Sequence, residues 1–251
     1  MHRVMIICLL VLGMMMFAQN AKSSDWPMFH KDVANTGYTD VIGPDTLNIT
    51  WKSIGGAPDH AIIYVNQCIY TVTTGGDVVC VDAQQGTILW YNHTGHIYSP
   101  PSHYNGQIYV STDNMLWCFD ARDGRLLCSM ETEETLRYME VREGQIYGLS
   151  GYNLLCLDAS NGTVIWSFPL SFSFFSSHIC IANNSIYLST GLTLYCIDMH
   201  TGKEQWSFEM DGEAGKPVFQ DGRIFLNGGE DIYCLITGGE MLWCFHSEEF
   251  M

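Results

Sequence analysis

Alternating apolar and polar residues dominate this chain. Residues 108–112 read Ile-Tyr-Val-Ser-Thr, and runs of five to seven positions with the same alternation recur between clusters of Gly, Asn and Asp. A period of two residues is typical of a strand with one buried face, and such clusters are typical of turns. No window shows the 3.6-residue period of an amphipathic helix. The pattern predicts an all-β fold.

The predicted strands belong to a sequence repeat. Cysteines at positions 80, 118, 156, 196 and 234 are separated by 38, 38, 40 and 38 residues, within segments of the form apolar-x-Cys-apolar-Asp-Ala-x-x-Gly-x-apolar-x-Trp. A period of this length indicates a repeat architecture. The repeated positions are Cys80, Asp82, Gly86 and Trp90; Cys118, Asp120 and Gly124; Cys156, Asp158, Gly162 and Trp166; Cys196, Asp198, Gly202 and Trp206; and, in a decayed last copy, Cys234 and Trp243.

Each repeat predicts four strands. In the second unit we place them at 97–103, 107–112, 115–120 and 125–129, with Asn105-Gly106 as a hairpin turn. A four-stranded sheet of about 40 residues cannot bury both of its faces alone. Packing such sheets around a common axis gives a β-propeller of four-stranded antiparallel blades.

The chain holds about five full units and one spare strand. The predicted blades occupy approximately 58–93, 96–130, 135–169, 174–210 and 213–246. Residues 47–52 match the last strand of a unit, because Trp51 precedes Trp90 by 39 residues. We therefore expect an incomplete or open propeller, whose free sheet edges invite pairing with another copy or a partner.

The repeat resembles that of a known family. Its pattern, preceded by Gly-x-Ile-Tyr, is similar to the PQQ-like (pyrroloquinoline quinone) propeller repeat, and the segment from Asp25 to Tyr38 is similar to the start of many exported members. The resemblance covers residues 25–246 and implies one propeller domain at 25–251. The family includes quinoprotein dehydrogenases, the propeller subunit of the bacterial outer-membrane assembly machinery and other exported proteins. These motifs specify a fold and not a function.

The first residues predict export. Arg3 precedes an apolar run of 15 residues from Val4 to Ala18, and small and polar residues follow as far as Ser24. This is the form of a secretory signal peptide, which we place at 1–21; the run is shorter than the ~20 residues of a spanning helix. We expect a secreted or extracytoplasmic protein with no transmembrane segment after cleavage. Four sequons offer sites for glycosylation, at Asn48, Asn92, Asn161 and Asn183.

The charge balance excludes one class of partner. The chain has 11 Lys and Arg against 27 Asp and Glu, a formal net charge of −16. Such a chain repels a phosphate backbone and an anionic membrane surface. We therefore expect no nucleic-acid binding.

The repeated side chains predict packing and turn roles. The cysteines fall on the third strand of each blade, too far apart between blades for a shared metal or a disulfide, so we assign them to tight apolar slots. Each repeated Asp precedes a Gly by four positions and is expected to accept hydrogen bonds from turn amides. The resemblance implies that the repeated Trp rings dock one blade against the next, which also suits a large ring on an outer strand.

One pair of cysteines departs from the repeat. Cys128 stands where most other units have Trp, and this position lies across the hairpin from Cys118. An exported setting favours a disulfide between the two. Cys68, Cys180 and Cys244 have no evident partner in the sequence.

Three histidines lie at a junction between units. His93-x-x-His96 has a spacing compatible with metal binding in a turn, and His103 follows. No third ligand recurs nearby in a recognisable motif. We interpret all three as solvated loop histidines and expect no metal there.

No catalytic motif accompanies the repeat. Paired hydrolytic acids, a Gly-x-Ser-x-Gly segment and a phosphate-binding glycine loop are absent as motifs. We expect a non-catalytic protein- or glycan-binding scaffold of the cell envelope or surface that needs no cofactor. One alternative is a quinoprotein oxidoreductase that binds pyrroloquinoline quinone and Ca²⁺. Another is a truncated propeller fragment with no independent activity.

Overall fold

The computed structural model describes residues 31–32, 34–36, 52, 62–133, 135–170 and 179–246. This part of the chain forms strands and contains no helix, which confirms the predicted all-β fold. It therefore also offers no apolar helix that could span a membrane. The predicted signal peptide at 1–21, the sequon at Asn48 and all but Lys52 of the spare strand at 47–52 lie outside the described residues.

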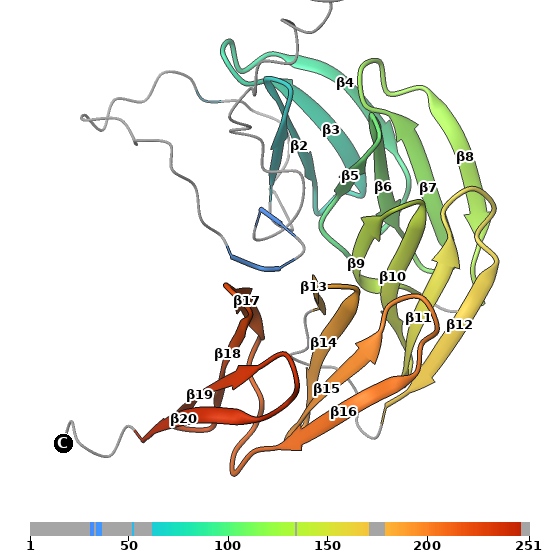
Figure 1. The fold of residues 1–251 in the computed structure, drawn as a ribbon. Coiled ribbons are helices and arrows are strands. Elements are labelled where there is room, and N and C mark those ends of the chain that lie inside the picture. The colour runs from blue at the N-terminus through green and yellow to red at the C-terminus, as the bar shows by residue number, and fades with distance from the viewer. Residues whose placement is uncertain are drawn as a thin grey trace, which may run out of the picture.

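Five antiparallel sheets of four strands each stand around a common centre (Figure 1). We call them blades 1 to 5 in chain order. Blades 1 and 2 comprise β1 (Ile63–Val65), β2 (Cys68–Val72), β3 (Asp77–Asp82), β4 (Ile88–His93), β5 (Ser102–Tyr104), β6 (Gln107–Ser111), β7 (Met115–Asp120) and β8 (Leu126–Glu131). Blades 3 to 5 comprise β9 (Arg137–Arg142), β10 (Gln145–Ser150), β11 (Asn153–Asp158), β12 (Val164–Pro169), β13 (Ile179–Ala182), β14 (Ser185–Thr190), β15 (Thr193–Asp198), β16 (Glu204–Glu209), β17 (Val218–Gln220), β18 (Arg223–Gly228), β19 (Asp231–Ile236) and β20 (Met241–His246).

The blades follow one another as in a propeller. Within every sheet the strands pair in sequence order, and the first strand of each blade contacts the first strand of the next, from β1 through β5, β9 and β13 to β17. The first strands therefore face the centre and the fourth strands face outward (Figure 1). This arrangement confirms an open propeller built from the predicted repeat.

The first hairpin of blade 2 confirms one expectation and corrects another. Asn105 and Gly106 have φ values of 52° and 75° and connect Tyr104 to Gln107, as expected for a two-residue turn with positive φ. The preceding strand was predicted at 97–103 but runs only from Ser102 to Tyr104. Residues 100 and 101 are both proline, which has no N–H to donate to a sheet, so the strand begins only after them.

A row of three side chains crosses the middle of the blades. The repeated Cys on the third strand faces an aromatic residue on the second strand and, in four blades, the repeated Trp on the fourth. In blade 1, Tyr70 pairs with Cys80 and Cys80 pairs with Trp90; the two rings are 5.9 Å apart. Cys80 is fully buried. A larger residue would have no room between the rings, so the slot selects a small apolar side chain.

The repeated Trp contacts the next blade. Three rings lie directly over a glycine of the following Asp-to-Gly turn or its equivalent: Trp90 over Gly124, Trp166 over Gly202, and Trp206 over Gly239. Their indole N–H groups donate hydrogen bonds of 2.9 to 3.1 Å to carbonyl oxygens of those turns. A β-carbon on any of the three glycines would lie 2.6 or 2.7 Å from the ring. Glycine is therefore needed both for positive φ and for this close approach.

The repeated Asp shapes the same turns. Asp82 Oδ1 accepts hydrogen bonds from the backbone N–H groups of Gln84 and Gln85 at 2.8 and 2.7 Å. Asp158 and Asp198 accept comparable backbone bonds. Hydrogen bonds from the hydroxyls of Ser160 and Thr201, followed by those backbone N–H groups, hold the pKa of both carboxyls below the ordinary value. Hydrogen bonds from Arg122 lower the pKa of Asp120 to about 2. These carboxylates therefore act as local turn acceptors.

A short segment before the blades lies between two inner strands. Asn35 is buried, and its side-chain amide donates to the carbonyl oxygens of Ile179 and Pro217 at 2.9 and 3.3 Å. The Ala34 carbonyl accepts a 3.0 Å bond from the Phe219 N–H. Residues 34–36 therefore connect blades 4 and 5 near the centre, where Figure 1 shows a short blue segment beside β17.

Candidate functional site

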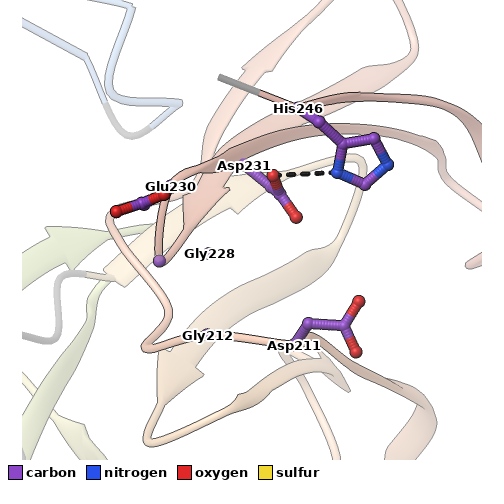
Figure 2. A pocket seen from close by; sticks show the side chains of 7 residues that line it. Asp211, Gly212, Gly228, Glu230, Asp231 and His246 are labelled. Atoms are coloured by element: carbon purple, nitrogen blue, oxygen red, sulfur yellow. Dashed lines mark hydrogen bonds and ion pairs between the residues drawn. The ribbon is translucent and has the colours of Figure 1, made fainter. Parts of the chain in front are cut away.

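A pocket of about 440 Å³ opens in blade 5 (Figure 2). It is lined by Asp211, Gly212, Gly228, Gly229, Glu230, Asp231 and His246. Three of these residues carry carboxyl groups, and the only basic side chain is the histidine. The lining therefore attracts cations.

Close backbone contacts hold the walls of this pocket in place. The Gly229 N–H donates a hydrogen bond to the Glu213 carbonyl at 2.9 Å, and Ala214 forms an isolated antiparallel β-bridge with Gly228. A β-carbon on Gly212 would lie 2.5 Å from the Gly229 Cα. Two loops thus approach each other more closely than side chains would allow, and this approach sets the shape of the pocket.

Three potential metal ligands gather beside the pocket, and two of them line it. Asp231 begins β19, Cys244 lies within β20 and His246 ends β20, and each offers one ligand atom within 4.8 Å of the other two. His246 Nδ1 lies 3.0 Å from Asp231 Oδ1, as Figure 2 shows, with Asp211 across the pocket. Burial, followed by the charge of Asp231, raises the pKa of the Cys244 thiol.

Blade 1 contains a partial counterpart of this cluster. Asp77 pairs with His93 in the same register as Asp231 with His246, and the His93 Nδ1 lies 2.9 Å from the Asp77 Oδ1. The position two residues before the histidine is Tyr91 in blade 1. The first blade therefore has the carboxylate and the imidazole without the thiol.

A second pocket, of about 550 Å³, lies between blades 2 and 3. It occurs where Cys128 replaces the repeated Trp, so no indole covers Gly162; the Met130 side chain lies over this glycine instead. The remaining lining is apolar along β11 and acidic at the end of β8: Glu131, Thr132, Glu133, Ser150, Asn153, Leu155, Leu157, Thr163, Val164 and Ser167. The pocket thus combines an apolar floor with a negatively charged rim.

One carboxyl group is deeply buried on an inner strand. Glu140 lies on β9, and its Oε2 has no hydrogen-bond partner among the described residues. Burial, followed by the nearby Asp32 charge, raises the pKa of Glu140 well above the ordinary value. The protonated form is therefore favoured at this site.

The three histidines near the junction of blades 1 and 2 have different surroundings. His93 pairs with Asp77, while His96 packs edge-on against Tyr98 with ring centroids 4.6 Å apart. His103 was expected in a loop but lies half-buried on the inner strand β5. Among the described residues, these three histidines form no ligand cluster.

The predicted disulfide partners lie opposite each other, but both are free thiols in this structure. Cys118 and Cys128 are register partners on β7 and β8. Burial, followed by the neighbouring Cys128, raises the pKa of Cys118 to about 12. The structure also reveals a neighbour that the sequence did not indicate: burial and then Cys68 raise the pKa of Cys80 to about 12. The disulfide between Cys118 and Cys128 stays a prediction.

The described sequons differ in accessibility. Asn161 and Asn183 are exposed in turns. Asn92 is half-buried, and its side-chain amide donates to the Gly124 carbonyl of the next blade at 2.7 Å. A glycan is therefore sterically easier to place at Asn161 and Asn183 than at Asn92.

The fold and its repeated contacts define the class of the protein, an open β-propeller built from PQQ-like repeats. Sequence comparison agrees, because the family model described as outer membrane protein assembly factor BamB matches residues 40–182 and 151–249. The chain belongs to this family. A search of curated protein sequences found no match.

Solved structures with the same fold include BamB, an outer membrane protein assembly factor, and two dehydrogenases. BamB from Moraxella catarrhalis is 14% identical, with a TM-score of 0.59 over 74% of this chain and 63% of its own. A europium-containing methanol dehydrogenase is 14% identical, with a TM-score of 0.73 over 89% and 58%. The quinohemoprotein alcohol dehydrogenase of Comamonas testosteroni is 15% identical, with a TM-score of 0.70 over 93% and 51%. The chain thus spans about half to two thirds of these structures, and the likeness concerns the fold alone.

The described residues do not fit a bound quinone with Ca²⁺ near the propeller centre. Ca²⁺ takes six to eight oxygen ligands, typically from ionised carboxylates. Among the described residues, no three carboxylate, imidazole or thiol groups gather near the propeller centre, and residues 34–36 lie between the inner strands of blades 4 and 5. No step of the function proposed below therefore uses this cofactor.

Proposed function

We propose that this chain is a non-catalytic scaffold of the cell envelope that binds a protein partner at the pocket between blades 2 and 3. Membership of the family described by an outer-membrane assembly factor supports the setting. The pocket supports the site, because at this blade junction Met130 replaces the indole over Gly162 and a pocket of about 550 Å³ lies beside it.

The surface around this pocket is apolar. The fourth strands of blades 2 and 3 begin with Leu126-Leu127 and Val164-Ile165, and each of these side chains is at least 36% exposed. The equivalent pairs are also apolar in blades 1 and 5, whereas blade 4 has Glu204 and Gln205, so the pocket and not the exposed strand alone distinguishes this junction. Exposed apolar side chains beside an apolar pocket are typical of the centre of a protein interface.

The lining also indicates which segment would bind. Leu155 and Leu157 suit an aromatic or aliphatic anchor, while Glu131 and Glu133 at the rim suit a basic residue beside it. Large anchors in desolvated pockets contribute most of the affinity of protein interfaces. The favoured ligand is therefore an exported protein segment with an aromatic residue next to Lys or Arg.

A crosslinking pull-down with matched variants tests this function. The tagged chain is captured from its native envelope beside Val164→Glu, which places a charge at the pocket, and Cys128→Trp, which restores the repeated indole. Both variants should lose one specific protein partner, whereas Ile88→Glu, at the exposed equivalent position of blade 1, should retain it. Equal recovery with all four chains would contradict the proposal.

Further outcomes separate the competing functions. Retention by a glycan array with no protein recovered would favour glycan binding. A bound chromophore and dye-linked alcohol oxidation after reconstitution with pyrroloquinoline quinone and Ca²⁺ would favour an oxidoreductase. Aggregation of the purified chain, rather than a monodisperse species, would favour an inactive fragment.

A further inference from the structure

The cluster in blade 5 brings together three different ligand chemistries. Asp231 offers a carboxylate oxygen, Cys244 a sulfur and His246 a ring nitrogen, with one atom from each within 4.8 Å of the others. Ligands on a tetrahedral Zn²⁺ lie about 2.0–2.3 Å from the metal and so roughly 3.3–3.8 Å from one another. The ligand atoms must therefore approach one another by about 1 Å at the largest separation in the cluster, and we expect side-chain rotations to supply this movement.

The sheet itself positions the three side chains. Cys244 and His246 are two residues apart on β20 and therefore point to the same face, and the register places Asp231 opposite His246. The Tyr233 hydroxyl lies 3.5 Å from Asp231 Oδ2 and helps to orient this carboxylate. Two adjacent strands thus supply a fixed frame for all three ligands.

Packing explains only part of this combination of residues. Cys244 packs against the core of blades 4 and 5, whereas the side chain of His246 is 68% exposed, so burial does not select an imidazole at this position. Blade 1 repeats the carboxylate and imidazole but has Tyr91 at the position of the thiol. Only blade 5, among the described residues, completes a set of three ligands.

We propose that Asp231, Cys244 and His246 bind Zn²⁺ or a chemically similar divalent transition metal. Thiolate and imidazole favour Zn²⁺, whereas Ca²⁺ and Mg²⁺ select sites made of oxygen atoms. The metal displaces the thiol proton of Cys244, which passes to the buffer, and no oxidation is involved. Three protein ligands leave a fourth position open toward the pocket, where Asp211 and Glu230 add negative charge.

Co²⁺ is the probe that tests this site, because it reports a thiolate ligand by a charge-transfer absorption. The purified, metal-free, reduced chain should bind one Co²⁺ with this absorption, and Zn²⁺ should displace it. Loss of an orienting carboxylate alone costs about 10–100-fold in metal affinity. We therefore expect Cys244→Ser to abolish the absorption and His246→Ala to weaken Zn²⁺ binding at least about tenfold.

Blade 1 supplies matched controls. His93→Ala removes the other imidazole paired with a carboxylate and should leave Zn²⁺ affinity unchanged. Tyr91→Cys completes a second set of ligands on an exposed strand and should raise the stoichiometry from one metal to two. Because these side chains are exposed or half-buried, circular dichroism should show the same fold for every variant.

Two results would overturn the proposal. The first is absence of the charge-transfer absorption in the unmodified chain. The second is equal metal affinity in the unmodified chain, Cys244→Ser and His246→Ala, which would assign binding to other thiols. The partner pull-down uses variants in blades 1 to 3, whereas the metal ligands lie in blade 5. Failure of the pull-down would therefore contradict the scaffold function without affecting the metal-binding result.

Discussion

Adding one methyl group at Gly202 tests the contact between blades 3 and 4. Gly202 has a φ of +68°, and a β-carbon there would lie 2.6 Å from the Trp166 ring. Gly106 has a φ of +75° with no heavy atom within 4 Å of an added β-carbon. The Gly202→Ala and Gly106→Ala variants therefore share the backbone penalty but differ in the steric one.

The expected magnitudes follow from these two contributions. A left-handed conformation costs a non-glycine residue about 1–2 kcal/mol, and overpacking costs about 1–3 kcal/mol more. We expect Gly106→Ala to lower the free energy of unfolding by about 1–2 kcal/mol and Gly202→Ala by about 2–5 kcal/mol. For a chain of this size, each kcal/mol lowers Tm by about 2–4 °C.

Urea unfolding followed by tryptophan fluorescence measures both variants, and a double mutant identifies the cause. In a Trp166→Ala background, the ring that meets the new methyl group is gone, so Gly202→Ala should cost no more than Gly106→Ala. If the two single variants lost equal free energy of unfolding in the unmodified background, the Trp166 ring would not be the cause of the additional cost at Gly202.

Three further predictions concern packing, protonation and the thiol pair. In urea unfolding, Trp90→Ala should lower the free energy of unfolding by about 3–5 kcal/mol because Trp90 is buried against blade 2. Trp243→Ala should lower it by about 1 kcal/mol or less because Trp243 is 44% exposed. Similar losses would contradict the assignment of Trp90 to a blade junction and of Trp243 to the last blade. The folded chain keeps a proton on Glu140 above pH 4.5 that the unfolded chain loses, so the free energy of unfolding should fall by up to about 1.4 kcal/mol per pH unit until the pH reaches the folded-state pKa. Tm measured against pH should show that Glu140→Gln removes this contribution to the slope. An unchanged slope would contradict the assignment to Glu140. Non-reducing peptide mapping of the natively exported chain should find Cys118 joined to Cys128, and alkylation of both thiols would exclude the disulfide.

The sequence predicted the fold because several independent signals coincide in the repeats. The alternation gives the strands, the 38- to 40-residue spacing gives the blades, and the Asp-to-Gly turn ends the third strand in the first four blades. Trp90 and Gly124 belong to successive repeats, so their contact follows once the blades are placed in order. The first strand of blade 2 was predicted too long, because the alternation continues through prolines that cannot join a sheet.

The candidate sites were harder to predict because they depend on contacts between segments without a motif. Asp231 and His246 are 15 residues apart, and only the strand register reveals that they face each other. Cys244 had no evident partner until this register was known. By contrast, the substitution of Trp by Cys128 was visible in the repeat, but the pocket it leaves depends on how Met130 packs.

Site-specific photo-crosslinking tests the central functional claim most directly. A photoreactive phenylalanine analogue at Val164, which is 53% exposed in the lining of the pocket, is compared with the same analogue at Leu89, which is 49% exposed on blade 1. After irradiation in the native envelope, we expect one specific protein adduct at position 164 and none at position 89. The same adducts from both positions, or no adduct at position 164, would contradict a binding site between blades 2 and 3.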